Sequence, residues 1–251
     1  KYHVDFSALH LDQDTAALCV SRPTNPTGNV LTDNEVAHLD AIARERDIPL
    51  IIDGAYGLPF PNISFVAATP HWNDNTILVL SLSKLGLPGV RTGIIVARED
   101  IIEAYTNANT IVNLACGTLG PAIAKALFHS GEILSLTRDH VTPFYRERSQ
   151  QTLHWFREAL GDLPWRCHKP EGAIFLWLWF EGLPITSQEL YQRLKRRGVL
   201  IVPGHNFFVG LADDWPHKQE CIRVSYAQDA AVVKQGVQLI AEEVRLAYEG
   251  R

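Results

Sequence analysis

The chain has 251 residues, of which 46% are hydrophobic and 20% charged, enough for one large folded domain or two modest ones. Its formal net charge of −5 argues against the basic surface that a dedicated nucleic-acid-binding protein presents to phosphates. The longest uninterrupted apolar run, Ala173 to Phe180, is too short to cross a bilayer as a helix. We therefore expect a cytoplasmic globular protein that binds neither nucleic acid nor a membrane.

The cysteines and the first residues agree with this expectation. The four cysteines are widely spaced and form neither a CxxC pair nor a cluster with histidine, so the sequence predicts neither a disulfide framework nor a metal site. Residues 1–6 lack the layout of a signal peptide. Because the chain contains no methionine and opens shortly before an apolar strand, we expect it to begin within a longer protein.

Four short apolar runs in the first half of the chain predict buried β-strands. Each run is bounded by polar residues, glycine or proline. The runs are Ala16–Val20, Pro49–Asp53, Thr76–Leu80 and Gly93–Ala97. Because they are continuous and do not alternate with polar residues, we expect a sheet that is covered on both faces.

An amphipathic helix is predicted between the first two strands. It covers Asp33 to Arg46, and Thr32 with Glu35 forms the sequence pattern of a capping box at its start. Strand, helix and strand in this order form a β-α-β unit, so we expect the strands to be parallel.

A helical region follows between residues 99 and 160, with expected interruptions at Pro121, Gly131 and Pro143. Its last part, Phe144 to Leu160, reads as one long amphipathic helix.

A domain boundary is predicted near the start of that helix, dividing the chain into residues 1–145 and 146–251. The second part contains three strand-like segments, Ala173–Phe180, Val199–Val202 and Cys221–Tyr226, and helices at Gln188–Arg197 and Ala230–Tyr248. The predicted fold class is therefore α/β, with a mostly parallel sheet in the larger domain and a smaller C-terminal α+β domain.

Polar residues stand directly after the predicted strands of the first half. Ligands bind beyond the carboxyl ends of the strands in an open parallel sheet. The residues concerned are Asn25, Asp53, Tyr56, Ser81, Ser83 and Lys84. Taken singly, each is more simply a turn residue, a capping residue or a solvated charge. Their convergence predicts a functional site at this edge of the sheet.

The same residues form an ordered set: Asn25-Pro26-Thr27-Gly28, then Asp53-x-x-Tyr56, then Ser81-x-Ser83-Lys84, then Arg91. This set resembles the fold-type I aminotransferases, which depend on pyridoxal 5'-phosphate. Arg91 follows Lys84 by seven residues, whereas many members space the pair by eight. The resemblance implies the cofactor, a two-domain fold and an absent N-terminal part of the larger domain.

The resemblance also implies a role for each residue that contacts the cofactor ring. Lys84 resembles the lysine that binds the cofactor aldehyde and moves a proton, and Asp53 the carboxylate that keeps the ring nitrogen protonated. Asn25 and Tyr56 resemble the two hydrogen-bond donors to the ring oxygen. Burial of Asp53 would raise its pKa unless that ion pair forms.

Three further residues of the set match anion-binding positions. Ser81, Ser83 and Arg91 resemble the site for the cofactor phosphate, which suits hydroxyl groups and a guanidinium. Arg223, on the predicted strand 221–226, resembles the arginine that binds the substrate carboxylate, together with Asn25. The alternative for Arg223 alone is a solvent-facing charge on an edge strand.

Within this superfamily, residues 19–26, 81–89 and 170–180 are similar to the bacterial valine–pyruvate aminotransferases. That similarity implies transfer of an amino group between valine and pyruvate, giving 3-methyl-2-oxobutanoate and alanine, by a homodimer in the full-length protein. Small aliphatic substrates would need an apolar pocket. Because the N-terminal part is absent, we expect the isolated chain to bind cofactor weakly and to aggregate or stay inactive.

Other interpretations of the same residues remain open. Another amino-acid aminotransferase or a carbon–sulfur lyase of this fold would share the residues named above. A transcriptional regulator could use an aminotransferase-like domain as its sensor. An inactive remnant is disfavoured, because every visible cofactor-contact position holds a chemically competent residue.

Overall fold

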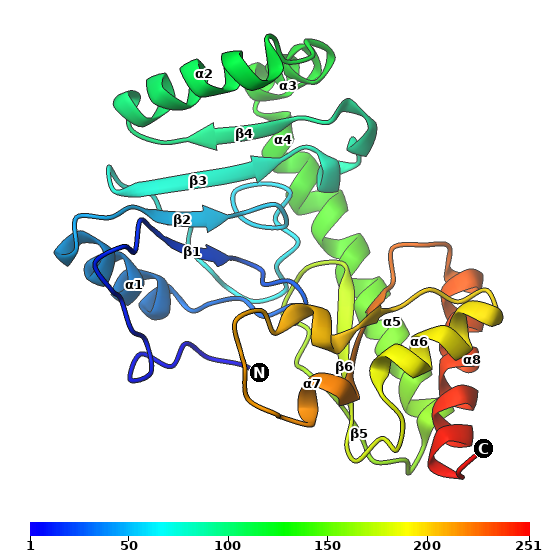
Figure 1. Ribbon diagram of the computed structural model, residues 1–251. Coiled ribbons are helices and arrows are strands. Elements are labelled where there is room, and N and C mark those ends of the chain that lie inside the picture. The colour runs from blue at the N-terminus through cyan, green and yellow to red at the C-terminus, as the bar shows by residue number, and fades with distance from the viewer.

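Two β-sheets, each with its own buried core, make up the computed structural model, which describes residues 1–251. Figure 1 shows the first sheet at upper left and the second at lower right, with helix α5 (Thr142–Leu160) running from one to the other. The predicted domain boundary at residues 145 and 146 falls inside α5 and stays a prediction.

The first sheet has four strands in the order β1-β2-β3-β4. They are β1 (Leu18–Ser21), β2 (Leu50–Asp53), β3 (Thr76–Ser81) and β4 (Gly93–Val96), close to the four predicted runs. Strands β1, β2 and β3 are parallel, as predicted, and in the aligned register Ser21 lies beside Asp53, and Asp53 beside Val79. The ends of three successive strands therefore lie at one edge.

Strand β4 is antiparallel to β3, so the sheet is mostly parallel, as the predicted fold class has it. Residues 82–92 connect the two strands through two short 3-10 turns, at Ser83–Leu85 and Pro88–Val90. A parallel neighbour needs a crossover connection, usually a helix, whereas this short connection suits an antiparallel return. The return also brings Gly93 beside Ser81.

Helix α1 (Asp33–Glu45) begins at the predicted capping box. The Thr32 side chain accepts a hydrogen bond from the Glu35 amide at 3.1 Å, and the Glu35 carboxylate accepts one from the Thr32 amide at 2.8 Å. The two bonds satisfy donors that a helix start otherwise leaves free. The prediction of a capped helix between β1 and β2 is thus confirmed.

Only one face of the first sheet is fully covered within this chain, so the expectation of a doubly covered sheet is wrong. Leu50, Ile52, Leu78 and Leu80 are buried together with residues of α1, α3 (Leu119–Ser130) and α4 (Glu132–Leu136). The residues between them on β2 and β3 are only partly buried, and Asp53 at the end of β2 is exposed. Helices lie on one side of this sheet and leave the other open.

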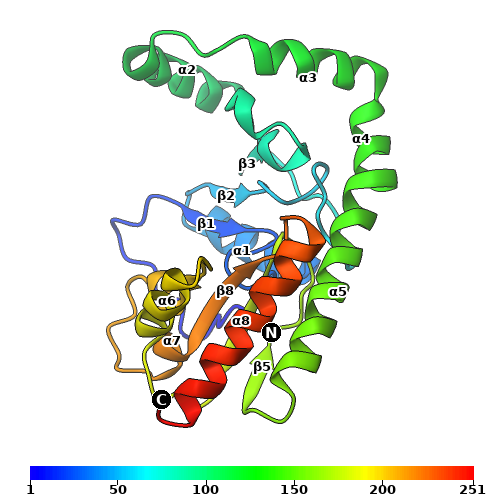
Figure 2. The same cartoon turned by 90° about the vertical axis from the view of Figure 1, so that its right-hand side faces the viewer.

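Four helices connect the two sheets. They are α2 (Glu99–Asn113), α3 (Leu119–Ser130), α4 (Glu132–Leu136) and α5, with a π-helical turn at 137–141 before α5. In Figure 2, α2 and α3 lie across the top, and α4 and α5 form the column at the right. Gly131 separates α3 from α4 with a φ of 72°, as predicted. Pro121 does not interrupt a helix, because it lies in the first turn of α3, where no backbone donor is lost. The π-helical turn ends just before Pro143, so the regular α-helix is interrupted there.

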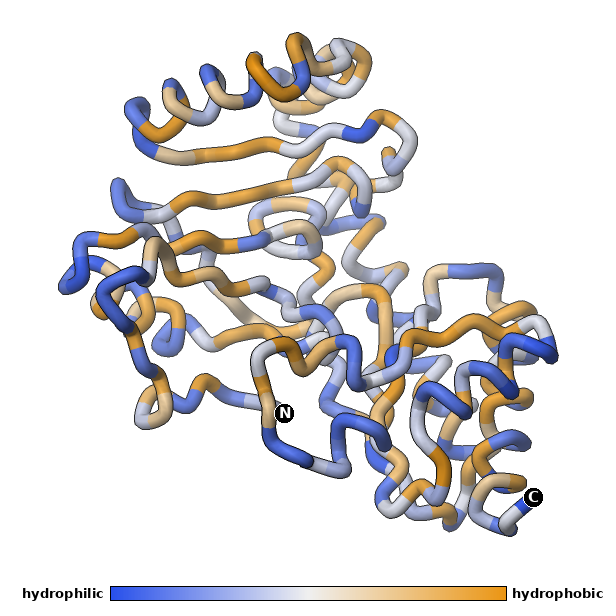
Figure 3. Tube along the Cα trace, viewed as in Figure 1, coloured by the Kyte–Doolittle hydropathy of each residue, from blue (hydrophilic) through white to orange (hydrophobic).

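Apolar side chains are exposed where α2 ends and α3 begins. No residue of α2 is buried, and Ile111, Val112, Leu114 and Leu119 are exposed. Figure 3 shows this end of α2 in the colour of hydrophobic residues. None of the helices in the fold is both long enough and apolar enough to span a membrane.

The second sheet is antiparallel, with the strand order β5-β6-β8-β7. Its strands are β5 (Trp165–Cys167), β6 (Phe175–Phe180), β7 (Val202–Pro203) and β8 (Cys221–Ser225). Strand β5 was not expected, and the strand predicted at 199–202 is reduced to two residues. Because β8 lies between β6 and β7, Arg223 is on an inner strand and not on an edge.

Three helices cover the second sheet: α5, α6 (Ser187–Arg196) and α8 (Ala230–Tyr248). Their apolar faces share one buried cluster that contains Phe156, Leu190 and Ile240. Thr186 caps α6 by accepting a hydrogen bond from the Glu189 amide at 3.1 Å. The short helix α7 (His217–Glu220), which was not expected, leads directly into β8.

Replacing Glu35 with glutamine should weaken the acid dependence of folding. Burial by itself raises the pKa of Glu35, but hydrogen bonds from Thr32, Val4 and His3 lower that pKa from 4.5 to about 2. The ionised carboxylate therefore stabilises the fold above pH 4.5, and this stabilisation is lost as the pH falls toward about 2. Urea unfolding followed by circular dichroism should show a smaller loss across this range in Glu35→Gln.

The matched control is Glu45→Gln, an exposed glutamate at the other end of α1. Its acid dependence should equal that of the unmodified protein. An equal loss of stability in Glu35→Gln and the unmodified protein would contradict the role of the capping carboxylate.

Candidate functional site

The polar residues that follow β1, β2 and β3 come together at the carboxyl edge of the first sheet. Asn25 follows β1, Asp53 and Tyr56 follow β2, and Lys84 follows β3. The parallel register of these strands brings their ends side by side. The predicted convergence is therefore present in the fold.

Arg223 reaches this edge from the second sheet. Its guanidinium Nη1 donates a hydrogen bond to Asn25 Oδ1 at 2.6 Å, across 198 residues of sequence. The guanidinium also lies over two aromatic rings, 4.9 Å from the centre of Phe175 and 5.2 Å from that of Phe207. Burial lowers the pKa of Arg223, although a guanidinium stays protonated in proteins. The Arg223 guanidinium is therefore a fixed, half-buried cation whose other N–H groups remain available to donate hydrogen bonds.

Tyr56 links Arg223 to Lys84. The Tyr56 ring packs edge-on against Phe175 with centres 5.5 Å apart, and Lys84 Nζ lies 5.5 Å from the centre of the Tyr56 ring. Burial is the largest cause of a raised pKa at Tyr56, and the positive charge of Arg223 opposes it. Tyr56 thus keeps its proton at neutral pH and can act as a hydrogen-bond donor.

A cavity of about 520 Å³ opens beside Lys84. Its far wall comes from the π-helical turn and the start of α5, including His140, Phe144 and Tyr145. Tyr145 is half-buried, and burial raises its pKa. No motif marks these residues in the sequence, and only the fold brings the start of α5 to Lys84.

Ser81, Ser83 and Arg91 form a second, more exposed group. Ser81 Oγ accepts the backbone amide of Ser83 at 3.1 Å, and Arg91 Nη1 lies at 3.5 Å from Ser83 Oγ. Arg91 adopts a left-handed backbone with a φ of 47° and is held by a hydrogen bond to the carbonyl of Pro88 at 3.2 Å. The group gathers two hydroxyls and a guanidinium next to Lys84.

Asp53 differs from the expectation of a buried carboxylate. It lies at the end of β2 as predicted, but its side chain is exposed, on the open side of the sheet, and accepts the amide of Ala55 at 3.0 Å. The continuous apolar run before it indicated burial, because that run was expected to lie in a doubly covered sheet.

A buried arginine that was not predicted from the sequence holds the loop after β1. Arg22 donates to the carbonyls of Leu31 and Thr69, both at 2.8 Å, and forms an ion pair with Asp33 at 2.6 Å. These bonds join both ends of the loop that carries Asn25. A single arginine after a strand has no pattern that distinguishes it from a surface charge.

The two sheets meet beside this loop with almost no space between the backbones. A Cβ on Gly28 would lie 2.9 Å from the carbonyl oxygen of Gly172. A Cβ on Gly172 would lie 2.5 Å from both the carbonyl oxygen of Ile63 and Cγ of Pro23. Only glycine therefore fits at either position.

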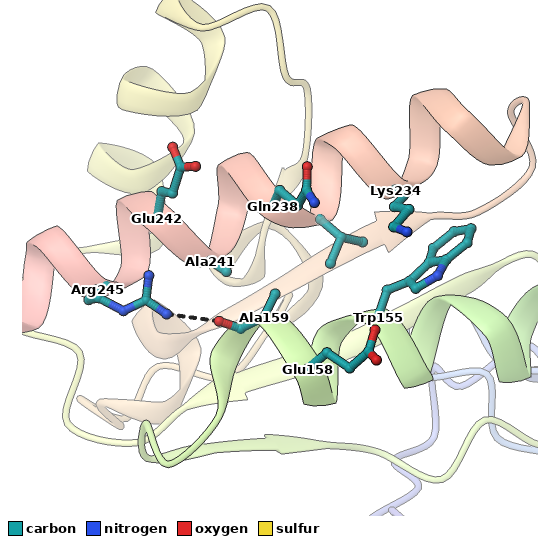
Figure 4. A pocket seen from close by; sticks show the side chains of 9 residues that line it. Trp155, Glu158, Ala159, Lys234, Gln238, Ala241, Glu242 and Arg245 are labelled. Atoms are coloured by element: carbon teal, nitrogen blue, oxygen red, sulfur yellow. Dashed lines mark hydrogen bonds between the residues drawn. The ribbon is translucent and has the colours of Figure 1, made fainter.

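A separate groove of about 460 Å³ lies on the outer side of the second sheet, between α5 and α8 (Figure 4). Trp155 and Lys234 line one part of it, and Arg245 donates a hydrogen bond to the carbonyl of Ala159 at 2.8 Å. None of the predicted site residues lines this groove. The candidate site is therefore the edge of the first sheet that carries Lys84 and that Arg223 reaches from the second sheet.

Comparisons with known proteins agree with this geometry. The family model described as aminotransferase class I and II matches residues 1–240. The valine–pyruvate aminotransferase of Escherichia coli (strain K12) is 54% identical over 99% of this chain and 60% of its own length.

Solved structures give the same result. The crystal structure of valine–pyruvate aminotransferase from Salmonella typhimurium LT2 is 52% identical, with a TM-score of 0.96 over 100% of this chain and 65% of that one. A putative amino-acid aminotransferase from Psychrobacter arcticum 273-4 is 51% identical, with a TM-score of 0.97 over 100% of this chain and 59% of that one. The chain thus spans less than two thirds of the length of these relatives.

Replacing Gly172 with alanine should destabilise the junction between the sheets. The added Cβ meets backbone that cannot move aside without shifting both sheets, so we expect a loss of about 2 kcal/mol. Urea unfolding measures this change.

Gly236→Ala is the matched control, because Gly236 lies in α8 and no atom stands within 4 Å of the position that its Cβ would occupy. Alanine there should stabilise by roughly 0.5–1 kcal/mol. A Gly172→Ala protein as stable as the unmodified one would refute the tight junction.

Proposed function

The chain belongs to the class I and II aminotransferase family, and from this we propose that its protein transfers an amino group between valine and pyruvate, giving 3-methyl-2-oxobutanoate and alanine. The observation that carries the proposal is the line of contacts from Arg223 through Phe175 and Tyr56 to Lys84. This line of contacts connects the Arg223 guanidinium, a cation that can bind a carboxylate, to the Lys84 amine, which can transfer a proton. The choice of substrates rests on the relative that is 54% identical.

The residues at this edge fit pyridoxal 5'-phosphate as the cofactor. Ser81, Ser83 and Arg91 gather two hydroxyls and a guanidinium, the groups that suit a phosphate dianion. Lys84 adds a primary amine on the border of a cavity. When bound, the cofactor supplies an aldehyde that combines with amines and a ring that accepts an electron pair.

Lys84 acts as the acid–base group of the reaction. Its Nζ would hold the cofactor aldehyde, and the free amine would carry a proton to and from the substrate α-carbon. The face of the Tyr56 ring attracts the lysine ammonium and keeps it near this position. Asp53 would accept a hydrogen bond from the protonated ring nitrogen of the cofactor.

Asn25 and Tyr56 would donate hydrogen bonds to the ring oxygen of the cofactor. A guanidinium can only donate, so Asn25 must present its oxygen to Arg223, which leaves the amide NH₂ of Asn25 free to donate. The raised pKa of Tyr56 keeps its hydroxyl proton available in the same way.

Arg223 binds the substrate carboxylate. The hydrogen bond to Asn25 uses one of its donors, and the aromatic rings of Phe175 and Phe207 restrict the movement of the guanidinium. A fixed fork of donors suits a carboxylate, because the side chain then loses little freedom when the substrate binds.

A homodimer is the proposed state of the protein. The exposed apolar residues Ile111, Val112, Leu114 and Leu119 support this proposal, because a monomer rarely leaves such a group in water. We propose residues 1–145 and 146–251 as its domains within this chain, since each sheet has a separate core cluster.

The cytoplasm is the proposed compartment. Cys19, Cys116, Cys167 and Cys221 are all free thiols, which suits a reducing environment.

Lys84→Ala should abolish covalent attachment of the cofactor. The natural polypeptide that contains this sequence is incubated with pyridoxal 5'-phosphate, reduced with borohydride and weighed by mass spectrometry. One added cofactor mass is expected in the unmodified protein and none in Lys84→Ala, because no other amine lies at the site. Lys125→Ala, at an exposed lysine of α3, should behave like the unmodified protein. Cofactor mass retained by Lys84→Ala would assign attachment to another residue.

Substrate profiling tests the proposed reaction against the other enzymes of this fold. With pyruvate as acceptor, kcat/KM for valine should exceed that for aspartate by at least about tenfold, because a site that accepts a small aliphatic side chain disfavours a second charge. No pyruvate should be released from a cysteine conjugate, the product expected of a carbon–sulfur lyase. Preference for a dicarboxylic or aromatic amino acid would contradict the proposed substrate.

A further inference from the structure

Glu171 is a buried carboxylate at the junction of the two sheets, and the proposed reaction does not use it. Only 4% of the residue is exposed. Its Oε2 accepts the backbone amide of Val30 at 3.1 Å and lies 2.7 Å from Nζ of Lys1, while Oε1 lies 3.6 Å from Nζ of Lys169. A buried carboxylate is retained at little cost only where it is paired in this way.

The backbone of Glu171 joins the same junction. Its amide donates to the carbonyl of Gly28 at 3.1 Å, and its carbonyl accepts the amide of Phe65 at 2.7 Å. One residue therefore contacts the loop after β1 through both its side chain and its backbone, and the segment after β2 through its carbonyl. The contacts with Gly28 and Val30 hold the C-terminal end of the loop that carries Asn25.

The other end of this short segment leads to the carboxylate-binding arginine. Phe175, four residues after Glu171, begins β6 and packs against the Arg223 guanidinium. Strand β6 also pairs with β8, where Trp177 lies opposite Arg223. Glu171 thus stands between the segment that positions Asn25 and the strand that positions Arg223.

The negative charge of Glu171 also contributes to the contacts at this junction. Lys1 Nζ contacts both the carboxylate and the carbonyl of Val30, so the ion pair and the loop share one cation. Burial by itself raises the pKa of Glu171, but the bonds from Lys1 and Val30 outweigh it and lower the pKa. The carboxylate is therefore ionised at neutral pH. A neutral side chain would leave the Lys1 ammonium at this junction without its partner.

We propose that Glu171 is a positioning residue that holds the Asn25 loop against strand β6 and so keeps Asn25 and Arg223 aligned to bind the substrate carboxylate. The inference rests on the proposed function for the identity of the substrates, while the junction itself follows from the contacts above. Because every substrate and product of the reaction carries this carboxylate, Glu171 affects the binding of all of them alike.

The test compares Glu171→Ala and Glu171→Gln with the unmodified natural polypeptide. Alanine removes both the acceptor and the charge, and glutamine keeps an acceptor for Val30 but removes the charge. For Glu171→Ala, KM for valine and for pyruvate should each rise about tenfold with kcat changed less than about threefold, since an interaction made equally in ground and transition states is lost. For Glu171→Gln the rise should be about threefold.

Two further measurements do not depend on turnover. Hydrogen exchange at the Val30 amide should accelerate at least about tenfold in Glu171→Ala and stay close to the unmodified rate in Glu171→Gln. The dissociation constant of 3-methylbutanoate, which carries the carboxylate and the branched chain but cannot react, should rise in both variants in parallel with KM. Glu181→Ala, at an exposed glutamate directly after β6, is the matched control and should change none of these values.

The outcomes separate the two proposals. If the unmodified protein does not transaminate valine, the proposed function fails, and the exchange rate and the 3-methylbutanoate affinity still decide the role of Glu171. If transamination is present but KM and the 3-methylbutanoate affinity are unchanged in Glu171→Gln and Glu171→Ala, the positioning role is wrong. If Glu171→Ala does not fold, the Glu171→Gln values decide: a threefold rise in both KM values supports the role, and unmodified values overturn it.

Discussion

The close approach of Gly28 and Gly172 is the constraint on which the candidate site depends. Neither residue has room for a Cβ, so the loop after β1 and the segment before β6 meet backbone to backbone. This contact places the edge of the first sheet against the segment that leads into β6 of the second sheet. As a result, Asn25 and Arg223 can share a hydrogen bond of 2.6 Å although 198 residues separate them.

Two halves of the site differ in how firmly this chain holds them. Arg223 is half-buried between aromatic rings and bonded to Asn25, so its position is restricted from several directions. Arg91 is exposed and held chiefly by its own loop, and Asp53 is exposed on the open side of the sheet. The half that contains Arg223 and Asn25 is therefore held by more contacts, and it is the half built from both sheets.

Local patterns predicted the elements well where one segment contains the whole signal. The capping box at Thr32 and Glu35 is such a case, because both partners lie within one turn of α1. The exposure of Asp53 was predicted wrongly, and no sequence pattern predicted the direction of β4. Both depend on what lies beside the segment, and an apolar run looks the same whether one or both faces of its sheet are covered.

The sequence by itself determined the family and picked out Lys84, Asn25 and Arg223 as candidate site residues. An ordered set of residues with fixed spacing can be recognised without knowing how the chain folds. Only the tertiary structure decided that Tyr145 borders the Lys84 cavity and that Glu171 joins the two sheets. The contacts of Tyr145 and Glu171 are with segments that are far away in the sequence. Such contacts are set by packing, which no local pattern of residues records.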